Sequence, residues 1–254
     1  MTEKPGAGSD FPDVAETLYG MNKRARWVAE ALSKFDNPDI LDVGCGTGEL
    51  LTIPIARRGY HITGTDFHLP SIEHARAVAG SAARFVHGTP HDAGGTYDVI
   101  ILSEVLEHVH EPVEMLSDLR SRLKPGGSLL LTVPNGRGPF EIDQWFWKRN
   151  FLWIPRLHAS YVAGCEASGQ AATLNDDNPH VNFFTRRTLA KVVHSAGFEI
   201  ARWAPRSFIC GSFPAIAIGA LRLPTEAIAR FNASVADKLP LSMASGWMLE
   251  LKAR

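Results

Sequence analysis

The sequence predicts an α/β fold: a doubly wound, mainly parallel sheet of seven strands with helices on both faces. Helical and strand-like segments alternate along most of the chain, which is the pattern of repeated β-α-β units. Two strand-like segments, 97–103 and 128–135, are nearly continuous apolar runs, as expected in a sheet that is covered on both faces. The 254 residues, 45% of them hydrophobic and 21% charged, are enough to bury the core of one large domain.

The individual elements follow from hydrophobic spacing and from residues that begin or end helices. Ser71 and Thr185 are expected N-caps, Pro112 opens its helix, Gly80 follows the end of another, and the turn 124–127 stops the fourth helix. The last two strands form a hairpin-like pair and predict an antiparallel edge. The expected helices are 18–35, 49–59, 71–80, 112–123 and 185–198, and the expected strands are 39–44, 60–66, 83–88, 97–103, 128–135, 199–204 and 247–253.

The chain divides into an N-terminal extension, residues 1–17, and one domain, residues 18–254. Two long segments interrupt the alternation, at about 136–181 and 206–244, and segments of this length usually carry function. The first contains an aromatic and basic stretch, 145–156. We interpret this stretch as a lid over the substrate, a patch in peripheral contact with a membrane, or a subdomain core. We expect the second insert to pack beside the first as a substrate cover.

Charge and cysteine content limit the classes of function. A net charge of −1 gives no electrostatic footprint for tight binding of nucleic acid. The three cysteines, Cys45, Cys165 and Cys210, are far apart and odd in number, which favours a reducing compartment over a disulfide framework. The first ten residues lack an apolar signal segment, and the longest mostly apolar run, 208–223, contains a proline and is too short to span a membrane. We therefore expect a cytoplasmic protein.

A glycine-rich turn follows the first predicted strand and precedes a helix. Gly44, Gly46 and Gly48 let the backbone turn sharply and approach a ligand, as glycines do in dinucleotide sites. The spacing G-x-G-x-G, with Asp42 just ahead, differs from the G-x-G-x-x-G phosphate fingerprint. The turn therefore indicates a cofactor site but argues against the NAD-binding alternative.

The segment D-V-G-C-G-T-G, residues 42–48, resembles motif I of the class I S-adenosylmethionine (SAM)-dependent methyltransferases. Segments resembling that family's second, fourth and fifth strands follow in the same order, so the resemblance covers about residues 18–204. It implies a Rossmann-like fold and SAM as the cofactor, with the ribose on Asp66, where one carboxylate can meet two hydroxyls. The cofactor-binding residues that it implies in this part of the chain are Asp42, Gly44, Cys45, Gly46, Asp66 and Phe67.

Three further cofactor contacts are implied by the same resemblance. Arg24 matches an arginine that binds the SAM carboxylate in O-methyltransferases of the ubiquinone type, although a solvated helix face is the alternative. Ser103 closes the fourth strand and should lie beside the methionine moiety. Thr89 stands where many relatives carry an adenine-binding aspartate, so the sequence departs from the family at the adenine contact.

Acidic and imidazole side chains crowd the segment SEVLEHVHEP, residues 103–112. As a helix, it would place Glu104, Glu107 and His108 on one face, at the sheet edge where open α/β folds bind ligands. Two carboxylates and an imidazole suit a divalent cation with open positions. The alternative is that the acids favour a helix start through the helix dipole and that His108 caps or packs. We expect the two remaining polar residues to be solvated: His110 and Glu111.

The spacing E-x-x-E-H resembles the magnesium-binding motif of ubiquinone-biosynthesis O-methyltransferases and of small-RNA 3′-end 2′-O-methyltransferases. The latter add a histidine just before the next helix, and His180 lies in the comparable place. The resemblance implies a site for Mg²⁺ or another divalent cation formed by Glu104, Glu107, His108 and His180. Such an ion would bind two adjacent substrate oxygens and lower the pKa of one hydroxyl. If they are not ligands, His108 or His180 could instead be the catalytic general base.

These features predict methyl transfer from SAM to a small-molecule substrate. The favoured reaction is O-methylation of a hydroxyl on a vicinal diol or catechol, assisted by a divalent metal, as a step in biosynthesis. One alternative is metal-free methylation of nitrogen, carbon or a lone hydroxyl with a histidine base. The others are 2′-O-methylation of RNA and a SAM-binding regulator without catalysis.

Overall fold

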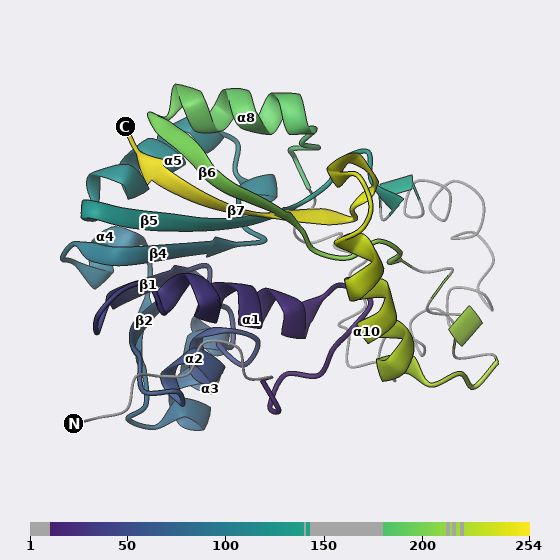
Figure 1. Ribbon diagram of the computed structural model, residues 1–254. Coiled ribbons are helices and arrows are strands. Elements are labelled where there is room, and N and C mark those ends of the chain that lie inside the picture. Colours follow the sequence, from purple (N-terminus) through teal and green to yellow (C-terminus); the bar gives the residue numbers. More distant parts are fainter. Residues whose placement is uncertain (1–10, 140, 143–179, 212–213, 215–216, 219–220) are drawn as a thin grey trace.

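A seven-stranded sheet organises the protein, with the strand order β3-β2-β1-β4-β5-β7-β6 (Figure 1). The computed structural model describes residues 11–139, 141–142, 180–211, 214, 217–218 and 221–254. Strands β1 to β5 pair in parallel, whereas β7 is antiparallel to both β5 and β6. This confirms the seven predicted strands and the predicted antiparallel edge. The strands are β1 (Asp39–Val43), β2 (His61–Asp66), β3 (Arg84–His87), β4 (Tyr97–Ser103), β5 (Leu123–Pro134), β6 (Phe198–Pro205) and β7 (Gly246–Ala253).

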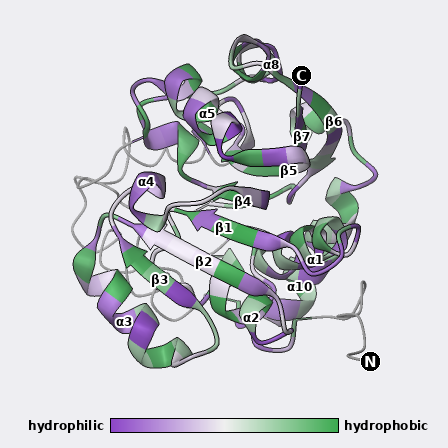
Figure 2. Ribbon diagram, turned by 90° about the vertical axis from the view of Figure 1, so that its left-hand side faces the viewer, coloured by the Kyte–Doolittle hydropathy of each residue, from purple (hydrophilic) through white to green (hydrophobic). Residues whose placement is uncertain are grey.

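Helices cover both faces of the sheet. In Figure 1, α5 and α8 lie on one face, and α1, α2 and α3 lie on the other. Helices α3 and α5 carry both hydrophobic and hydrophilic bands in Figure 2, as expected of helices with one face against a sheet. The helices are α1 (Met21–Leu32), α2 (Thr52–Ala56), α3 (Leu69–Ala79), α4 (Pro90–Ala93), α5 (Pro112–Ser121), α8 (Arg186–Ser195) and α10 (Thr225–Ala236), with short 3₁₀ turns η1 (Leu106–His108) and η2 (Leu241–Met243).

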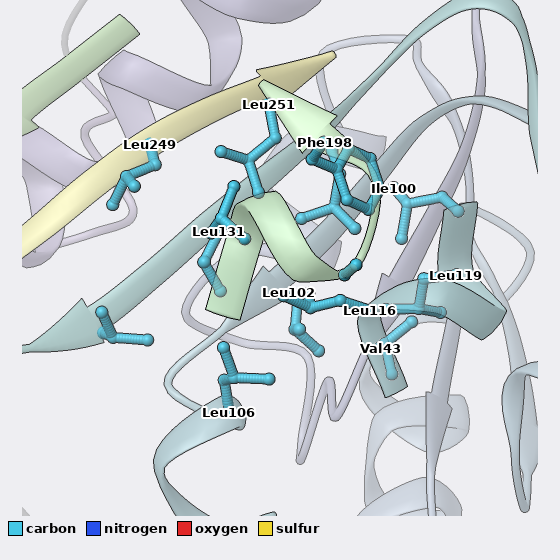
Figure 3. Packing of buried hydrophobic residues seen from close by; sticks show 14 of the residues in the cluster. Val43, Ile100, Leu102, Leu106, Leu116, Leu119, Leu131, Phe198, Leu249 and Leu251 are labelled. Atoms are coloured by element: carbon cyan, nitrogen blue, oxygen red, sulfur yellow. The ribbon is translucent and has the colours of Figure 1, made fainter. Parts of the chain in front are cut away.

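The apolar run of β4 explains how the two layers are held together. Successive side chains of a strand point to opposite faces. Val99 and Ile101 therefore pack with α1 and α2, whereas Ile100 and Leu102 pack with α5 and α8. Figure 3 shows the second layer, in which Leu106 of η1 joins Leu102. Burial of Leu106 anchors the loop that follows β4 to the core.

Several predicted boundaries are wrong for local reasons. Helix α3 begins at Leu69 with His68 as N-cap, so Ser71 is not the cap; it hydrogen-bonds His68 Nδ1 at 2.8 Å instead. The segment 124–127 does not form a stop after α5, because α5 ends at Ser121 and 124–127 belongs to β5. The predicted capping role of Thr185 is confirmed, since its hydroxyl accepts from the Thr188 N–H.

The largest error in the predicted elements lies between β4 and α5. The expected helix from residue 104 is absent, and the chain makes only the 3₁₀ turn η1 before α5 begins at Pro112. Glu104 adopts the left-handed conformation, with φ 58°, which an α-helix excludes. The shared helical face that the sequence predicted for Glu104, Glu107 and His108 therefore does not form.

Both peripheral segments are attached to α1 or to the residues just before it. Residues 11–17, assigned to an extension, are attached to α1, because Asn22 Nδ2 donates to the carbonyls of Phe11 and Val14. The second insert contains the unpredicted helix α10, where Asn232 Nδ2 donates to the carbonyls of Leu18 and Ile209. No helix in the described part of the chain is long and apolar enough to cross a membrane.

Candidate active site

The carboxyl ends of β1, β2 and β4 meet at one edge of the sheet, and the glycine-rich turn lies there. The N–H groups of Gly44 and Cys45 both donate to the Thr65 carbonyl, at 2.8 and 3.0 Å. The Gly46 N–H donates to Asp66 Oδ2 at 2.8 Å. The turn after β1 is thus fixed to the end of β2, and the predicted cofactor residues of the two strands lie together.

Two glycines of this turn have distinct structural reasons. Gly44 has φ 71°, and a Cβ built on it would lie 2.4 Å from Cγ2 of Val105, so the loop after β4 approaches too closely for a side chain. Gly46 has φ 55°, and a Cβ there would meet no described atom within 4 Å. Gly46 therefore borders open space beside Asp66, where a ligand can approach the backbone.

Asp42, in β1, and Cys45, in the glycine-rich turn, both have a raised pKa. Asp42 is buried, and burial raises its pKa to about 6, although its Oδ2 accepts a 2.6 Å hydrogen bond from the Thr52 hydroxyl at the start of α2. Burial, followed by the charges of Asp42 and Asp66, raises the pKa of the Cys45 thiol. This shift disfavours the thiolate form of Cys45.

The ribose and adenine side of the predicted site is formed by the ends of β2 and β3. Both Asp66 oxygens accept backbone N–H groups at 2.8 Å, from Gly46 and from His68. Phe67 is 74% exposed, so its ring is available to a ligand. Thr89 is the N-cap of α4, and both its N–H and its hydroxyl donate to Asp92 Oδ2. Thr89 and Asp92 thus form a capping box, and the adenine contact of Thr89 stays a prediction.

Arg24 is buried, so the alternative of a solvated helix face is wrong. It is 4% exposed, its Nη1 donates to Ser103 Oγ at 3.0 Å, and its Nε has no hydrogen-bond partner among the described residues. Ser103 is in turn hydrogen-bonded to Thr132 Oγ1 of β5 at 2.9 Å. Arg24 and Ser103, both predicted to contact the methionine part of the cofactor, therefore lie together at the end of β4.

Glu104 continues this network away from the other predicted metal ligands. Its Oε1 accepts from Thr132 Oγ1 at 2.8 Å, and its Oε2 forms an ion pair with Arg206. Burial alone would raise the pKa of Glu104, but the charges of Arg206 and Arg24 bring it below the usual value. Arg206 was not among the predicted site residues, because it lies about 100 positions further along the chain and belongs to no motif.

Glu107 has the opposite environment. It is 1% exposed, and its Oε2 has no hydrogen-bond partner among the described residues. Burial, followed by the neighbouring charge of Glu104, raises the pKa of Glu107 well above its usual value. A buried carboxylate oxygen without a partner is costly, and it marks a place where a cation or a donor would be accommodated.

Glu107, His108 and His180 come together, as predicted for three of the four metal ligands. One ligand atom from each lies within 4.8 Å of the other two, and the two imidazole rings are 4.9 Å apart. The backbone supports this approach, since the N–H groups of Val181 and Asn182 both donate to the Glu107 carbonyl at 2.9 Å. Glu104 is not part of this group.

Two residues that the sequence did not indicate hold the cluster. The Asn182 amide donates to the Val109 carbonyl at 2.6 Å, which ties the segment before α8 to the loop after β4. Glu141 lies 3.0 Å from His180 Nδ1. A carboxylate at Nδ1 leaves the lone pair of the imidazole on Nε2, the usual arrangement of an oriented histidine.

The remaining predicted residues fall into two groups. His110 and Glu111 are exposed, as expected, and Glu111 is the N-cap of α5. The aromatic and basic stretch 145–156 and Cys165 lie outside the described residues, so the interpretations of that stretch stay predictions. Of the residues described near His180, Ile142, Val181 and Phe183 expose apolar side chains.

Sequence comparison places the chain among known enzymes. The family described as "Methyltransferase domain" matches residues 19–202. The ubiquinone biosynthesis O-methyltransferase of Vibrio parahaemolyticus is 33% identical over 134 residues, covering 50% of this chain and 57% of that protein. Its namesake from Aeromonas salmonicida is 31% identical over 199 residues, covering 75% of this chain and 76% of that protein. The first relatives are thus matched over little more than half of their length.

Solved structures share the same fold at lower identity. Magnesium protoporphyrin IX methyltransferase from Synechocystis PCC 6803, with bound SAH, has a TM-score of 0.55 and 19% identity, covering 92% of this chain and 83% of that one. The CcbJ methyltransferase from Streptomyces caelestis has a TM-score of 0.56 and 15% identity, covering 99% and 100%. At these low identities the similarity is evidence for the fold alone. It confirms the predicted Rossmann-like architecture.

Proposed function

The chain belongs to the class I SAM-dependent methyltransferases of the ubiquinone O-methyltransferase type, and from this premise we propose that it methylates a vicinal diol or catechol with the help of a divalent cation. The observation that carries the proposal is the buried Oε2 of Glu107, which has no hydrogen-bond partner among the described residues and lies beside His108 and His180. The names of the curated relatives support a hydroxyl as the acceptor.

The residues present fit SAM. Open space at Gly46, the acid Asp66 at the end of β2 and the exposed ring of Phe67 suit a nucleoside, and the buried guanidinium of Arg24 suits the carboxylate of the methionine part. When bound, SAM supplies an electrophilic methyl group on a positively charged sulfonium. The roles of the chain are then to orient the acceptor and to remove its proton.

The residues present also fit a divalent cation. One carboxylate and two imidazoles are a donor set for borderline cations such as Mn²⁺, and they leave positions open for substrate oxygens. When bound there, the ion supplies positive charge that lowers the pKa of a coordinated hydroxyl. Glu107 and the two histidines would hold it, and Glu141 would fix the ring of His180.

A second candidate is metal-free transfer with a histidine as general base. The 3.0 Å contact between His180 Nδ1 and Glu141 favours it, because a carboxylate that orients an imidazole raises its competence as a base. In this mechanism His180 would take the hydroxyl proton directly. A lone hydroxyl would then serve as well as a diol.

Metal binding separates the two candidates. We would titrate Mn²⁺ into the protein loaded with S-adenosylhomocysteine (SAH), comparing wild type with Glu107→Gln and His180→Ala. The matched control is His110→Ala, which removes an exposed imidazole two residues from the cluster. We expect one-to-one binding in wild type and control, and its loss in both site variants.

The acceptor class is tested with simple phenols. We expect SAH release with 3,4-dihydroxybenzoate or a longer-chain catechol, dependent on Mn²⁺ or Mg²⁺, and none with the matching monohydroxybenzoates. Equal turnover of both kinds of phenol in the presence of a chelator would overturn the metal mechanism and favour the histidine base. SAH binding in every variant shows that the cofactor site is intact.

A further inference from the structure

Glu104 belongs to the E-x-x-E-H segment but is not part of the cluster formed by Glu107, His108 and His180. Its N–H donates to the Thr132 carbonyl at 3.0 Å, and its Oε1 accepts from the Thr132 hydroxyl at 2.8 Å. Its Oε2 pairs with Arg206. Three contacts with β5 and with the residue after β6 therefore fix this left-handed residue, and both carboxylate oxygens are engaged.

Arg206 occupies a slot that is shaped for it. The side chain is 4% exposed and lies between two glycines. A Cβ on Gly246 would lie 2.9 Å from its guanidinium, and a Cβ on Gly20 would lie 3.0 Å from its Cγ. The Arg206 N–H also donates to the Gly246 carbonyl at 3.0 Å. A long side chain confined in this way presents its charge to Glu104 in one orientation, with little freedom to withdraw.

We propose that Arg206 is a positioning residue that keeps Glu104 out of the coordination of the cation, so that Glu107, His108 and His180 alone hold the ion. This inference rests on the metal-assisted function proposed above. Its consequence is an open site with one carboxylate, which leaves more positions for substrate oxygens than a site with two. It also leaves a divalent ion with net positive charge, which favours a deprotonated hydroxyl at that place.

The second insert thereby takes part in the chemistry without touching the substrate. Arg206 is the first residue of the insert, and Asn232 of α10 holds the next turn of it by accepting from the N–H groups of Phe208 and Ile209. The insert thus provides the counter-charge that sets the ligand set of the cation. The sequence assigned this insert only a covering role.

The test is Mn²⁺ binding to the SAH-loaded full chain, followed by the electron paramagnetic resonance of free Mn²⁺ and by water-proton relaxation of the bound ion. The variants are Glu104→Gln, Glu107→Gln, Arg206→Gln and the double variant Glu104→Gln with Arg206→Gln. We expect Glu104→Gln to leave the dissociation constant essentially unchanged. Glu107→Gln should weaken binding by more than the roughly 100-fold that loss of an outer contact costs.

Release of Glu104 is the decisive arm. In Arg206→Gln we expect the freed carboxylate to join the ion, so that binding tightens roughly tenfold and the ion loses coordinated water. The double variant should restore wild-type affinity and wild-type relaxation, because the competing carboxylate is gone. Arg206→Lys keeps the positive charge and should resemble wild type.

Three results would count against the inference in distinguishable ways. If Glu104→Gln weakens Mn²⁺ binding as much as Glu107→Gln, Glu104 is a ligand and the inference fails while the metal site stands. Unchanged affinity and relaxation in Arg206→Gln would also overturn it. Absence of binding in wild type would overturn the metal mechanism itself. Should Arg206→Gln not fold, Glu104→Gln and the double variant still decide whether Glu104 is a ligand, because a loss of Mn²⁺ affinity in either one as large as in Glu107→Gln would overturn the inference.

Discussion

The loop after β4 uses the same side chain in opposite ways at its two ends. Glu104 has both oxygens engaged, by Thr132 and Arg206, and its pKa lies below the usual value. Glu107, only three residues later, is 1% exposed, whereas the Glu104 side chain is 28% exposed. One Glu107 oxygen has no hydrogen-bond partner among the described residues, and the pKa of Glu107 lies well above the usual value. Burial raises the pKa of Glu107, whereas the charges of Arg206 and Arg24 lower the pKa of Glu104. Burial and charged partners together therefore distinguish a structural counter-ion from a candidate ligand.

The comparison predicts very different costs for two isosteric substitutions. Glu104→Gln leaves the buried cations of Arg206 and Arg24 without their shared counter-charge, and we expect it to lower the free energy of unfolding by about 3–5 kcal/mol. At Glu107 burial disfavours the charged form, so replacing the carboxyl by an uncharged amide in Glu107→Gln should cost under about 1 kcal/mol. Urea denaturation of the two variants in the presence of a chelator measures both values, and equal losses would erase the distinction.

Asp42 is another buried acid with a raised pKa, and it tests whether burial also causes the upward shift in the pKa of Glu107. Its folded pKa of about 6 lies above its ordinary value of 3.8, so the folded protein holds the proton more tightly. The protonated carboxyl of Asp42 therefore stabilises the folded protein relative to the ionised carboxyl. This contribution to the free energy of unfolding is complete below pH 3.8 and is lost as pH rises through 6. Above that pH the ionised group opposes folding by up to about 3 kcal/mol.

Asp42→Asn should remove this penalty. We expect the variant to gain up to about 3 kcal/mol over wild type at pH 8, and the gain to fade toward pH 4. The amide oxygen can still accept the hydrogen bond from Thr52, which keeps the start of α2 in place. Urea midpoints at the two pH values test this. A difference that is the same at both would indicate packing instead of ionisation.

The Thr132 hydroxyl is the uncharged hydrogen-bond partner of Glu104, and its removal should have a smaller effect on stability. Thr132→Val deletes a hydroxyl that donates to a charged carboxylate, which should cost about 2 kcal/mol of unfolding free energy. In the Glu104→Gln background the same change should cost much less, because the acceptor is then uncharged. A double-mutant cycle gives the coupling energy, and additive costs would mean that Thr132 and Glu104 act independently.

The sheet could be predicted from the sequence because its signals are local. The apolar run of β4 and the glycine turn after β1 encode elements whose partners are other elements of the same repeating unit. The capping role of Thr185 was visible for the same reason, since a cap and its N–H partner lie within one turn. The cofactor residues were implied by the resemblance of residues 42–48 and the later strands to a known family, and parallel strands bring several of these positions to one edge of the sheet.

The conformation of the loop after β4 could not be predicted in the same way, because residues distant in the sequence determine it. The spacing of Glu104, Glu107 and His108 suits a helix, yet Glu104 is held in a left-handed conformation by Thr132 of β5 and by Arg206. No local pattern marks Arg206, whose slot depends on Gly20 and Gly246, 186 and 40 positions away from it. A motif identifies which residue types gather at a site, and the tertiary partners then separate a candidate ligand from a counter-ion.

The smallest expected effect on stability concerns Asn182, which ties the segment that carries His180 to the loop after β4. Asn182→Ala removes the amide bond to the Val109 carbonyl but leaves the backbone bonds from Val181 and Asn182 to the Glu107 carbonyl. We therefore expect a cost of only about 1 kcal/mol in unfolding free energy. Because those residues adjoin His180, the same change should still weaken Mn²⁺ binding, whereas the far more destabilising Glu104→Gln should not. We thus expect Glu104→Gln to lose more stability than Asn182→Ala but less Mn²⁺ affinity. A loss of affinity that follows the loss of stability in the two variants would refute this expectation.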